Sequence, residues 1–570
     1  MVEKGITGGR CLLLAPPLTV AFGDMKKTAQ NGGLLRLASY LQAKGIEARI
    51  HDCLVEGWEN LRAEGAYTQT WGLSDEEIVR RVRDFSPDVI GINAFAAVYH
   101  RDVVALAKLL KKEFPNSLIV AGGNQATLMP ELLLRDADGA IDFLVLYEGE
   151  EALAKIIGLQ KQKDRESIKR LPGAAYIENG TFISNPRGAQ TDLNAVFGAL
   201  DPSLISHIPY APQPTHAYPT GDRKVIDLSI TLGCPRACYW CKSWLAQGKE
   251  MRMPSIEALG KALDALSAAD YGEIIMQDDS FTRAPPEYIR AALRLIVEKG
   301  FRWQNNGGVE LETLYDYKEG RPHEEFIKLF GETGCTNLFL PLNLSRHEVE
   351  KGDRVQKDFG IYRAVAERLR AAGIAVYASF ITGVPGMPLG LQEKVMGFFA
   401  GLMREGLSFN NIIYAYSPFP DTKIFDRSFA SDGRGGFAQR EGATLEFPLD
   451  PTPGPSYSFN YPGVEVRGEY DYPTMFRRYF SWLIEANCGI KGAFQLTDGK
   501  WNGRKYQTDD EALAAAQERL TPRLGKFQDA KAAFRRGRAH VDIPVSMKDG
   551  AVRRLRIPAP PQAARKKVMI

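Results

Sequence analysis

The feature that most constrains the fold of this chain is a regular alternation of compact apolar segments with amphipathic ones. In the first 155 residues, strand-like runs such as "RCLLLAPP" and "PDVIGINAF" alternate with helix-like runs such as "GGLLRLASYLQAKG" and "YHRDVVALAKLLKKEFP". The strand-like runs are short, apolar and rich in branched residues, which is typical of buried parallel strands. We therefore predict an α/β protein that begins with a doubly wound, Rossmann-like parallel sheet.

A second alternating series begins at residue 223. Its six strand-like runs are "KVIDLSIT", "GEIIMQDD", "RWQNNGGVEL", "CTNLFLPLN", "AVYASFITG" and "NNIIYAY". Six βα units predict a partial (β/α)6 barrel of the TIM type, with its site at the carboxyl ends of the strands. The predicted organisation is an N-terminal domain over 1–160, a connector over 161–222, the barrel over 223–430, and a smaller, α-rich C-terminal region over 431–570.

Composition limits the classes of function. The chain has 570 residues, of which 44% are hydrophobic and 25% charged, so it has material for several buried cores. A formal net charge of +3 gives no support to a nucleic-acid-binding surface spread over the molecule. Only seven cysteines in so long a chain favour a reducing compartment. Because no apolar run approaches the ~20 residues that span a bilayer, we expect a cytoplasmic protein without a membrane segment.

Three of the seven cysteines lie in one loop, "TLGCPRACYWCKSW", which follows the first strand of the predicted barrel. Cys234, Cys238 and Cys241 have the spacing C-x3-C-x2-C. A structural zinc site usually has four protein ligands, so this loop is one ligand short unless a distant residue completes it. An iron–sulfur cluster held by three thiolates would instead leave one iron open for a substrate or cofactor. We expect the cluster, with the zinc site as the alternative.

The cysteine loop and three later segments together resemble the radical S-adenosylmethionine (radical SAM) superfamily. The resemblance implies that Trp240 flanks the cofactor, that "IIMQDDSFT" holds the amino end of SAM, and that "FITGVPGMP" lies near its adenine. "AYSPFPDTKIFD" resembles the last-strand segment of that superfamily. Where many relatives have a glutamate on a middle strand, this chain has Asn343 in "PLNLSR". The SAM-binding residues implied in this way are Trp240, Gln277, Asp278, Asp279, Asn343, Gly383, Pro385 and Gly386.

The first 155 residues resemble the cobalamin-binding domain of the cobalamin-dependent group within that superfamily. The matching segments are "LLLAPP", "GLLRLASYLQAKGIEARIHD", "PDVIGINAF", "VAGGNQAT" and "IDFLVLYEGE". The cobalamin-binding residues implied are Pro17, Asn93, Gly122, Gly123, Glu148, Gly149 and Glu150. None of the seven histidines lies in an Asp-x-His-x-x-Gly pattern, and Gln125 stands where relatives often have histidine. The lower ligand of cobalt is therefore left open.

The resemblance implies an enzyme with three cofactors: a [4Fe-4S] cluster, SAM and cobalamin. The implied reaction is a cobalamin-dependent radical SAM methyl transfer from methylcobalamin to an unactivated carbon of a small-molecule or peptide substrate, with electrons supplied by a donor such as flavodoxin or ferredoxin. One SAM would methylate cob(I)alamin, and a second would be cleaved reductively to a 5′-deoxyadenosyl radical. Two alternatives remain: a relative that cyclises or rearranges a ring without methyl transfer, and a non-catalytic metal-binding protein.

Several isolated residues carry weaker signals. His100 and His347 lie at the ends of predicted elements and are candidate catalytic residues, although a lone histidine is more often a surface or capping residue. We expect Cys335 to pack in a core, because free cysteine behaves as a small hydrophobe. From residue 535 onward the chain has ten Lys and Arg residues against two Asp residues. Such a basic tail is usually solvated, with binding to an acidic partner as the alternative.

Overall fold

The structure is a computed structural model of the whole chain. It describes residues 8–21, 31–64, 68–96, 99–210, 224–236, 238–342, 355–382, 389–408, 410–415, 421–431 and 437–440. Beyond these it describes residue 419 and five short pieces, 464–465, 500–501, 504–505, 540–546 and 552–558. In these parts of the chain, no helix is long and apolar enough to cross a membrane.

The N-terminal half contains a seven-stranded sheet with the strand order β10-β9-β8-β7-β6-β1-β3. The strands are β1 (Arg10–Ala15), β3 (Glu47–Asp52), β6 (Val89–Asn93), β7 (Leu118–Gly122), β8 (Phe143–Val145), β9 (Ala174–Glu178) and β10 (Thr181–Ser184). The five strands from β3 to β8 in this order are parallel, and the β9–β10 hairpin extends the sheet with antiparallel pairs. The predicted Rossmann-like parallel sheet is confirmed.

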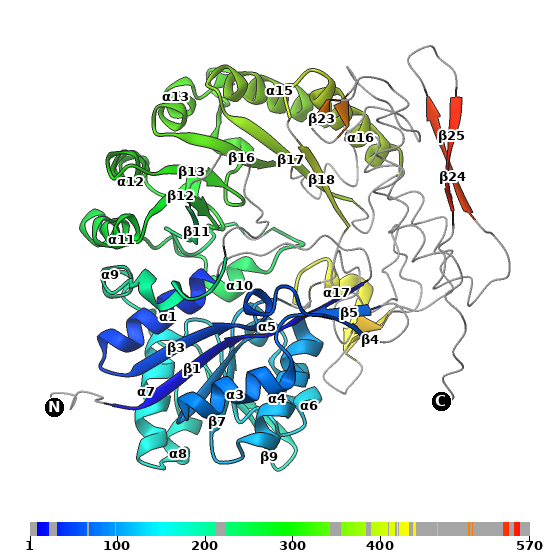
Figure 1. The fold of residues 1–570 in the computed structure, drawn as a ribbon. Coiled ribbons are helices and arrows are strands. Elements are labelled where there is room, and N and C mark those ends of the chain that lie inside the picture. Colours follow the sequence, from blue (N-terminus) through cyan, green and yellow to red (C-terminus); the bar gives the residue numbers. More distant parts are fainter. Residues whose placement is uncertain are drawn as a thin grey trace.

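Helices cover both faces of this sheet, as Figure 1 shows in blue and cyan. They are α1 (Gly32–Ala43) and α7 (Glu150–Lys161) on one face, and α3 (Asp75–Phe85), α4 (His100–Glu113) and α6 (Pro130–Ala137) on the other. The alternation along β1 explains this arrangement, because successive side chains of a strand point to opposite faces. Leu13 packs in the core with α1 and α7, whereas Leu12 and Leu14 pack in the core with α3, α4 and α6.

Local signals in the sequence agree with several of these elements. Ser74 and Glu77 form a capping box at the start of α3, so two backbone N–H groups that would otherwise lack partners are satisfied. The turn of the β9–β10 hairpin has positive φ at both Asn179 and Gly180, as the Asn-Gly dipeptide predicts. A small antiparallel sheet of β2 (Leu18–Ala21), β4 (Leu61–Glu64) and β5 (Thr68–Trp71) was not predicted.

The second half contains a six-stranded sheet in the order β11-β12-β13-β16-β17-β18, in which every neighbouring pair is parallel. The strands are β11 (Lys224–Leu228), β12 (Tyr271–Met276), β13 (Arg302–Asn305), β16 (Cys335–Pro341), β17 (Ala375–Thr382) and β18 (Asn410–Ala415). The helices between them are α11 (Ile256–Ala268), α12 (Pro286–Glu298), α13 (Glu324–Glu332), α15 (Val355–Ala371) and α16 (Leu389–Arg404). All six predicted strands are present, and a helix connects each strand to the next.

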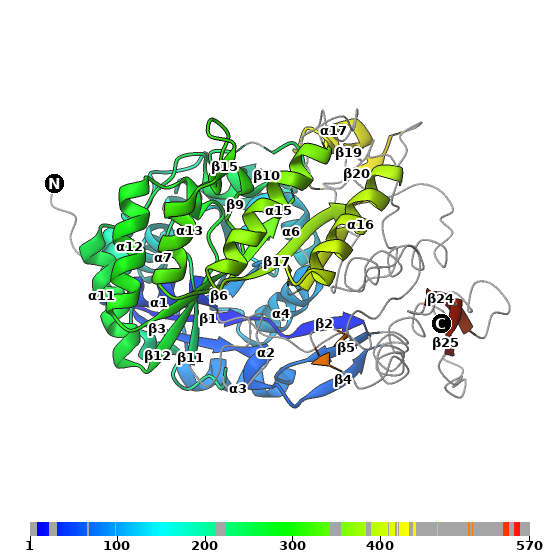
Figure 2. The same cartoon turned by 90° about the horizontal axis from the view of Figure 1, so that it is seen from above.

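The two sheets pack together through α1, α9 (Leu193–Gly198) and α10 (Ser243–Gln247), which lie between them in Figure 1. Figure 2 shows α1 from above, beside β3. The approach is close at the start of α1. A Cβ atom added to Gly32 would lie 2.6 Å from the carbonyl oxygen of Asp227, at the end of β11. Along the chain, α8 (Arg165–Lys169) precedes the β9–β10 hairpin, and the 3-10 helix η2 (Pro202–Ile205) lies between that hairpin and β11.

Most of the predicted α-rich C-terminal region lies outside the described residues. The described part after β18 contains α17 (Phe425–Ser428) and the strands β19 (Phe429–Ser431), β20 (Phe437–Gln439), β21 (Val464–Glu465), β22 (Lys500–Trp501) and β23 (Arg504–Lys505). Part of the basic tail forms an antiparallel hairpin of β24 (His540–Ser546) and β25 (Val552–Pro558).

Candidate functional site

The cysteine loop leaves the carboxyl end of β11, and neighbouring residues fix its path. The buried carboxylate of Asp278, which follows β12, accepts hydrogen bonds from the backbone N–H groups of Ile230 and Thr231 and from the Thr231 hydroxyl, at 3.2, 2.5 and 2.7 Å. Gly233 comes next with a φ of +94°, and a Cβ atom there would lie 1.9 Å from the carbonyl oxygen of Glu250. Only glycine fits this position, so the loop is held closely on both sides.

The three cysteines of this loop are free thiols, each half-buried. Burial and, after it, the neighbouring thiol of Cys241 together raise the pKa of Cys238 to about 11, and burial also raises the pKa of Cys234. Burial and the mutual repulsion of three negative charges therefore disfavour ionisation of all three thiols unless a cation binds them. A metal–sulfur cluster supplies that positive charge, and its binding displaces the thiol protons. The donor set fits a cluster ligated by three cysteines.

The aromatic residue predicted beside the cluster lies on the same loop. Trp240 is half-buried and packs edge-to-face on Tyr239, with ring centroids 4.4 Å apart. After Cys241 the chain enters α10, where Ser243 lies 3.5 Å from the Cys241 sulfur through both its backbone nitrogen and its hydroxyl oxygen. These two groups are polar neighbours of a ligating sulfur, the kind of contact that adjusts the potential of a cluster.

The three residues predicted to hold the amino end of SAM occupy different environments. The Gln277 side chain donates to Asp227 at 2.8 Å, and the Asp278 carboxylate is occupied by the start of the cysteine loop. Asp279 differs: burial raises its pKa, the Ser243 side chain hydrogen-bonds to it, and its Oδ2 atom is buried without a partner. A buried carboxylate oxygen that lacks a donor beside the cluster loop fits an ammonium group.

Two asparagines at the end of β13 were not singled out from the sequence. Asn305 and Asn306 each have a buried side-chain nitrogen without a hydrogen-bond partner, although the Asn305 oxygen accepts from Gly307 at 3.0 Å. They follow the strand next to β12, at the same edge as Asp279. The only signal in the sequence was their place at the end of a barrel strand. The predicted residues Asn343, Gly383, Pro385 and Gly386, together with His347, lie outside the described residues.

On the N-terminal sheet, the point where the strand order reverses lies between β1 and β6, and such points are where ligands of doubly wound sheets bind. Asn93 ends β6, and its side chain donates to Asn31 at 3.1 Å. Phe95, two residues later, is 57% exposed, which is unusual for a large apolar ring so close to a buried strand. An exposed aromatic ring at this point suits the flat, largely apolar face of a corrinoid.

The glycines and the proline predicted at this edge have steric roles. Gly123 has a φ of +111°, and a Cβ atom added there would lie 2.7 Å from the carbonyl oxygen of Ala94. A Cβ atom added to Gly122 would lie 3.3 Å from the carbonyl oxygen of Val145. The turn after β7 is therefore pressed against the end of β6. Pro17 is buried and lies close to Gly72.

The segment Glu148-Gly149-Glu150 has its carboxylates engaged within the protein. Glu148 accepts from Arg252 at 2.7 Å and Arg187 at 3.1 Å, and Glu150 accepts from Arg36 at 3.0 Å. Arg252 belongs to the barrel half, in a bridge with Leu232 beside the cysteine loop. Glu148 therefore holds the two halves together, and no free carboxylate of this segment is left for a ligand. Gly149 packs against Leu37.

Gln125, the residue in place of the expected histidine, is 1% exposed and hydrogen-bonded to His100, whose other ring nitrogen lies 2.7 Å from Asp136. Burial lowers the pKa of His100, although Asp136 acts to raise it. The candidate catalytic role of His100 finds no support here, because the ring is enclosed between two partners. Cys335 is 6% exposed at the start of β16, in the core that the sequence predicted.

Lys242, next to the last cysteine, was also not singled out. Its side chain is almost completely buried, and it donates to the carbonyl oxygen of Leu128 at 3.0 Å and to Asp421 at 3.0 Å. Leu128 ends α5 (Asn124–Leu128), the helix that follows Gly122 and Gly123, and α5 packs directly on α10. The cysteine loop of one half is thus bound to the glycine turn region of the other. No local pattern in the sequence could reveal a contact over this separation.

The fold and the site together define an α/β protein in which a cofactor-binding Rossmann-like half faces a cysteine-loop barrel. Residues 19–157 match the model of the B12 binding domain, and residues 228–396 match that of the radical SAM superfamily. The chain belongs to the cobalamin-dependent radical SAM enzymes. The prediction of three cofactors is confirmed at the level of these domains: cobalamin for the first, and a [4Fe-4S] cluster with SAM for the second.

Curated relatives of the chain are methyltransferases. It is 25% identical to cytidylyl-2-hydroxyethylphosphonate methyltransferase of Streptomyces wedmorensis over 408 residues, which is 66% of this chain and 73% of that protein. It is 25% identical to an uncharacterised methyltransferase of Pyrococcus horikoshii over 436 residues, 74% of this chain and 84% of that protein.

A solved structure shares the fold. The radical SAM methyltransferase TsrM from Kitasatospora setae, determined with cobalamin and a [4Fe-4S] cluster bound, superimposes with a TM-score of 0.55 at 15% identity, covering 90% of this chain and all of TsrM.

Proposed function

We propose that this enzyme transfers a methyl group, by way of cobalamin, to an unactivated carbon of a small-molecule or peptide substrate. SAM supplies the methyl group and, when cleaved at the cluster, the radical that activates the carbon. The observation that carries the proposal is the direct attachment of the cysteine loop to α5 through Lys242. This contact brings the cluster region and the cobalamin region to one interface, as a reaction that uses both cofactors requires.

The residues of the site would divide as follows. Cys234, Cys238 and Cys241 hold the cluster, and Asp279 receives the ammonium group of SAM at its unpartnered carboxylate oxygen. Asn93 and Phe95 border the corrinoid. Residues 1–160 would form the cobalamin domain, 161–222 the connector, 223–430 the SAM domain and 431–570 the part that covers the substrate. A flavodoxin or ferredoxin would deliver the electrons that reduce the cluster.

The proposal is tested by measuring the products of SAM in an anaerobic reaction with reductant and cobalamin. Methylation of the corrinoid leaves S-adenosylhomocysteine, and radical formation leaves 5′-deoxyadenosine and methionine. With the true substrate, both products should accumulate in near-equal amounts per methylated product. 5′-Deoxyadenosine without matching S-adenosylhomocysteine would indicate a cyclase or ring-rearranging enzyme, and S-adenosylhomocysteine alone a methyl transfer without hydrogen abstraction.

The substrate itself can be sought with labelled SAM. Purified enzyme and trideuteromethyl-SAM are added to extracts of cells that lack this protein, and mass spectrometry identifies compounds that gain a labelled methyl group. The matched control is the Cys234→Ala, Cys238→Ala, Cys241→Ala variant, which should label nothing. Labelling that persists in this control would show that another enzyme in the extract is responsible.

A further inference from the structure

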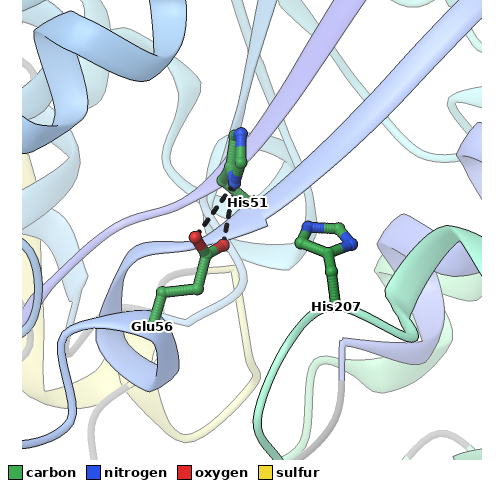
Figure 3. Close-up of side chains that lie close together, drawn as sticks. All are labelled: His51, Glu56 and His207. Carbon is green, nitrogen blue, oxygen red and sulfur yellow. Dashed lines mark hydrogen bonds and ion pairs between the residues drawn. The ribbon is translucent and has the colours of Figure 1, made fainter.

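Two histidines and a glutamate gather at the edge of the N-terminal sheet (Figure 3). His51 lies near the end of the edge strand β3, Glu56 ends α2 (Cys53–Glu56), and His207 follows η2 in the connector. One ligand atom from each lies within 4.8 Å of the other two. We propose that His51, Glu56 and His207 form a binding site for a divalent transition-metal ion such as Zn²⁺.

The carboxylate of Glu56 is held in place and ionised. Its Oε1 atom accepts from the backbone N–H of Asp52 at 3.0 Å, and its Oε2 atom accepts from Arg81 at 3.0 Å. Burial acts to raise the pKa of Glu56, but hydrogen bonds from His51 and Arg81 outweigh it, so the pKa is lowered. Metal-ligating carboxylates are usually oriented by such outer hydrogen bonds.

The ring of His207 is held by one hydrogen bond. Its Nε2 atom lies 3.1 Å from the carbonyl oxygen of Ile50. Because a carbonyl oxygen only accepts, Nε2 carries the hydrogen, and the lone pair of the neutral ring is on Nδ1. In Figure 3 Nε2 is the ring nitrogen nearer His51 and Glu56, so an ion would bind Nε2 in place of this hydrogen bond, and the ring hydrogen would move to Nδ1. Figure 3 shows this ring opposite His51 and Glu56, and its centroid is 5.6 Å from that of His51.

His51 completes the set through its Nδ1 atom, which lies 2.9 Å and 3.1 Å from the two carboxylate oxygens of Glu56. In the metal-free protein a hydrogen on Nδ1 bridges these groups. A metal ion would replace this hydrogen and take both as ligands, with release of a proton to solvent.

The ligand types specify the class of metal. Two imidazoles and one carboxylate suit Zn²⁺, with water in the fourth position, whereas Mg²⁺ and Ca²⁺ require mainly oxygen ligands. The exposed position of His207 gives an ion access from solvent. The positive charge of Arg81 opposes the ion, so the site should bind more weakly than a buried four-ligand zinc site.

Metal binding at this site would fasten the connector to the N-terminal sheet. Three residues after His207, the Tyr210 hydroxyl donates to Asp52 at 3.0 Å, and the same oxygen of Asp52 accepts from Asn31 at 2.6 Å. Asn31 in turn accepts from Asn93 at the strand-order reversal. The ion would therefore stabilise the contact between the connector and the edge where cobalamin is expected. The proposed site does not depend on the reaction that the enzyme catalyses.

The test measures zinc binding to the holoenzyme, loaded with its cluster and cobalamin, by equilibrium dialysis with Zn²⁺ and elemental analysis of zinc and iron. The wild type should bind one zinc ion per chain with no loss of iron. His207→Gln, an exposed substitution that should not disturb folding, is expected to weaken binding by about tenfold or more. His323→Gln, which changes a histidine of the barrel, is the matched control and should bind zinc as the wild type does.

A second measurement uses the wild type alone, so it does not depend on the folding of any variant. Hydrogen exchange of the wild-type holoenzyme should slow in residues 50–57 and 202–210 when Zn²⁺ is added, and should not change with Mg²⁺. Equal zinc binding by His207→Gln and the wild type would overturn the proposal. So would zinc uptake matched by loss of iron, because that would place the zinc at the cysteine loop.

Discussion

At the scale of single residues, neighbouring carboxylates beside the cysteine loop have different roles. Both carboxylate oxygens of Asp278 accept hydrogen bonds from the start of the loop, at Ile230 and Thr231. Asp279 keeps one buried oxygen without a donor. Sequence reasoning grouped the two with Gln277, because adjacent positions after a strand look equivalent until the side-chain directions are known. The structure separates a residue that positions the loop from one that can face SAM.

We expect Asp279→Asn to weaken SAM binding by about tenfold to a hundredfold, the usual loss for one charge-assisted hydrogen bond. Iron content should stay normal, because Asp279 holds no part of the loop backbone. Equilibrium dialysis with labelled SAM measures the change.

Asp278→Asn is the matched comparison, since it removes a carboxylate one residue away. It should lower the free energy of unfolding by about 2–3 kcal/mol, through loss of the bonds to Ile230 and Thr231, and reduce iron incorporation. If Asp279→Asn loses iron while Asp278→Asn loses only SAM affinity, the two assignments are reversed.

The three cysteines allow a direct test of the cluster against the zinc alternative. Replacing any one of Cys234, Cys238 or Cys241 with alanine should abolish most iron and sulfide binding, because a cluster with two thiolate ligands is not retained. Cys335→Ala is the control: its buried thiol should affect the free energy of unfolding by about 1 kcal/mol and leave the iron content unchanged. Stoichiometric zinc without iron in the anaerobically purified wild type would refute the cluster.

The buried carboxyl of Asp52 should make stability depend on pH. Burial raises its pKa to about 6 in the folded protein, against an ordinary value of 3.8, although Val55, Tyr210 and Asn31 donate to it. Between these values the folded state binds the proton more tightly than the unfolded state, so this group's contribution to stability falls as pH rises from about 4 to about 6. Urea unfolding across this range should show a steeper decline for the wild type than for Asp52→Asn. Identical pH profiles would show that Asp52 does not titrate in this window.

At the scale of elements, the strands and helices followed from the sequence more completely than their contacts did. Strands such as β1 and β7 are apolar runs bounded by glycine or proline, so each of these is encoded locally. The β9–β10 hairpin was recognised from Asn179 and Gly180, but its pairing with β8 was not, because pairing depends on the register of a distant strand. The packing of α5 on α10 likewise depends on Lys242 meeting a backbone carbonyl more than a hundred residues away.

We expect Lys242→Met to loosen the contact between α5 and α10 while each half keeps its cofactor. The methionine retains the apolar stem but leaves the buried carbonyl of Leu128 without a donor, at a cost of about 1–3 kcal/mol. Hydrogen exchange should accelerate in residues 124–128 and 243–247, with iron and cobalamin contents unchanged.

Asp421→Asn provides the control for the other partner of Lys242. Because the side chain of Asp421 is 72% exposed, its ion pair should contribute less than about 1 kcal/mol, and exchange in the two helices should change little. If Asp421→Asn accelerated hydrogen exchange in these helices more than Lys242→Met does, the turn after β18, and not α5, would be what holds the cysteine loop.

At the scale of the whole molecule, the relation between the two halves gives them a joint function. The carboxyl end of β11 meets the start of α1, and Glu148 of the first half binds Arg252 of the second. The sequence predicted two cofactor domains and the edge of each that would hold its ligand. It could not predict that these edges face each other, because the resemblance marks Glu148 only as a cobalamin-binding residue and Gly32 only begins a helix-like run. Both are interface residues, and interfaces between sheets leave no periodic pattern in a sequence.

Gly32 tests whether this interface is needed for the cofactors to react together. In Gly32→Val, the new side chain would meet the carbonyl oxygen of Asp227, because even its Cβ atom has only 2.6 Å of space. Such overpacking costs about 1–3 kcal/mol and is relieved most easily by movement of one half away from the other. Iron and cobalamin should both be retained, while hydrogen exchange accelerates in residues 32–36 and 224–228.

The same variant should form S-adenosylhomocysteine from SAM and reduced cobalamin at least tenfold more slowly than the wild type, because this step needs SAM from one half and cobalamin from the other. Gly33→Ala is the control: a Cβ atom there has nothing within 4 Å, and alanine in place of glycine in a helix should stabilise by up to about 1 kcal/mol. Normal S-adenosylhomocysteine formation in Gly32→Val, despite faster exchange at both segments, would show that the two cofactors meet without this contact. Loss of cobalamin instead would place Gly32 in the corrinoid site itself.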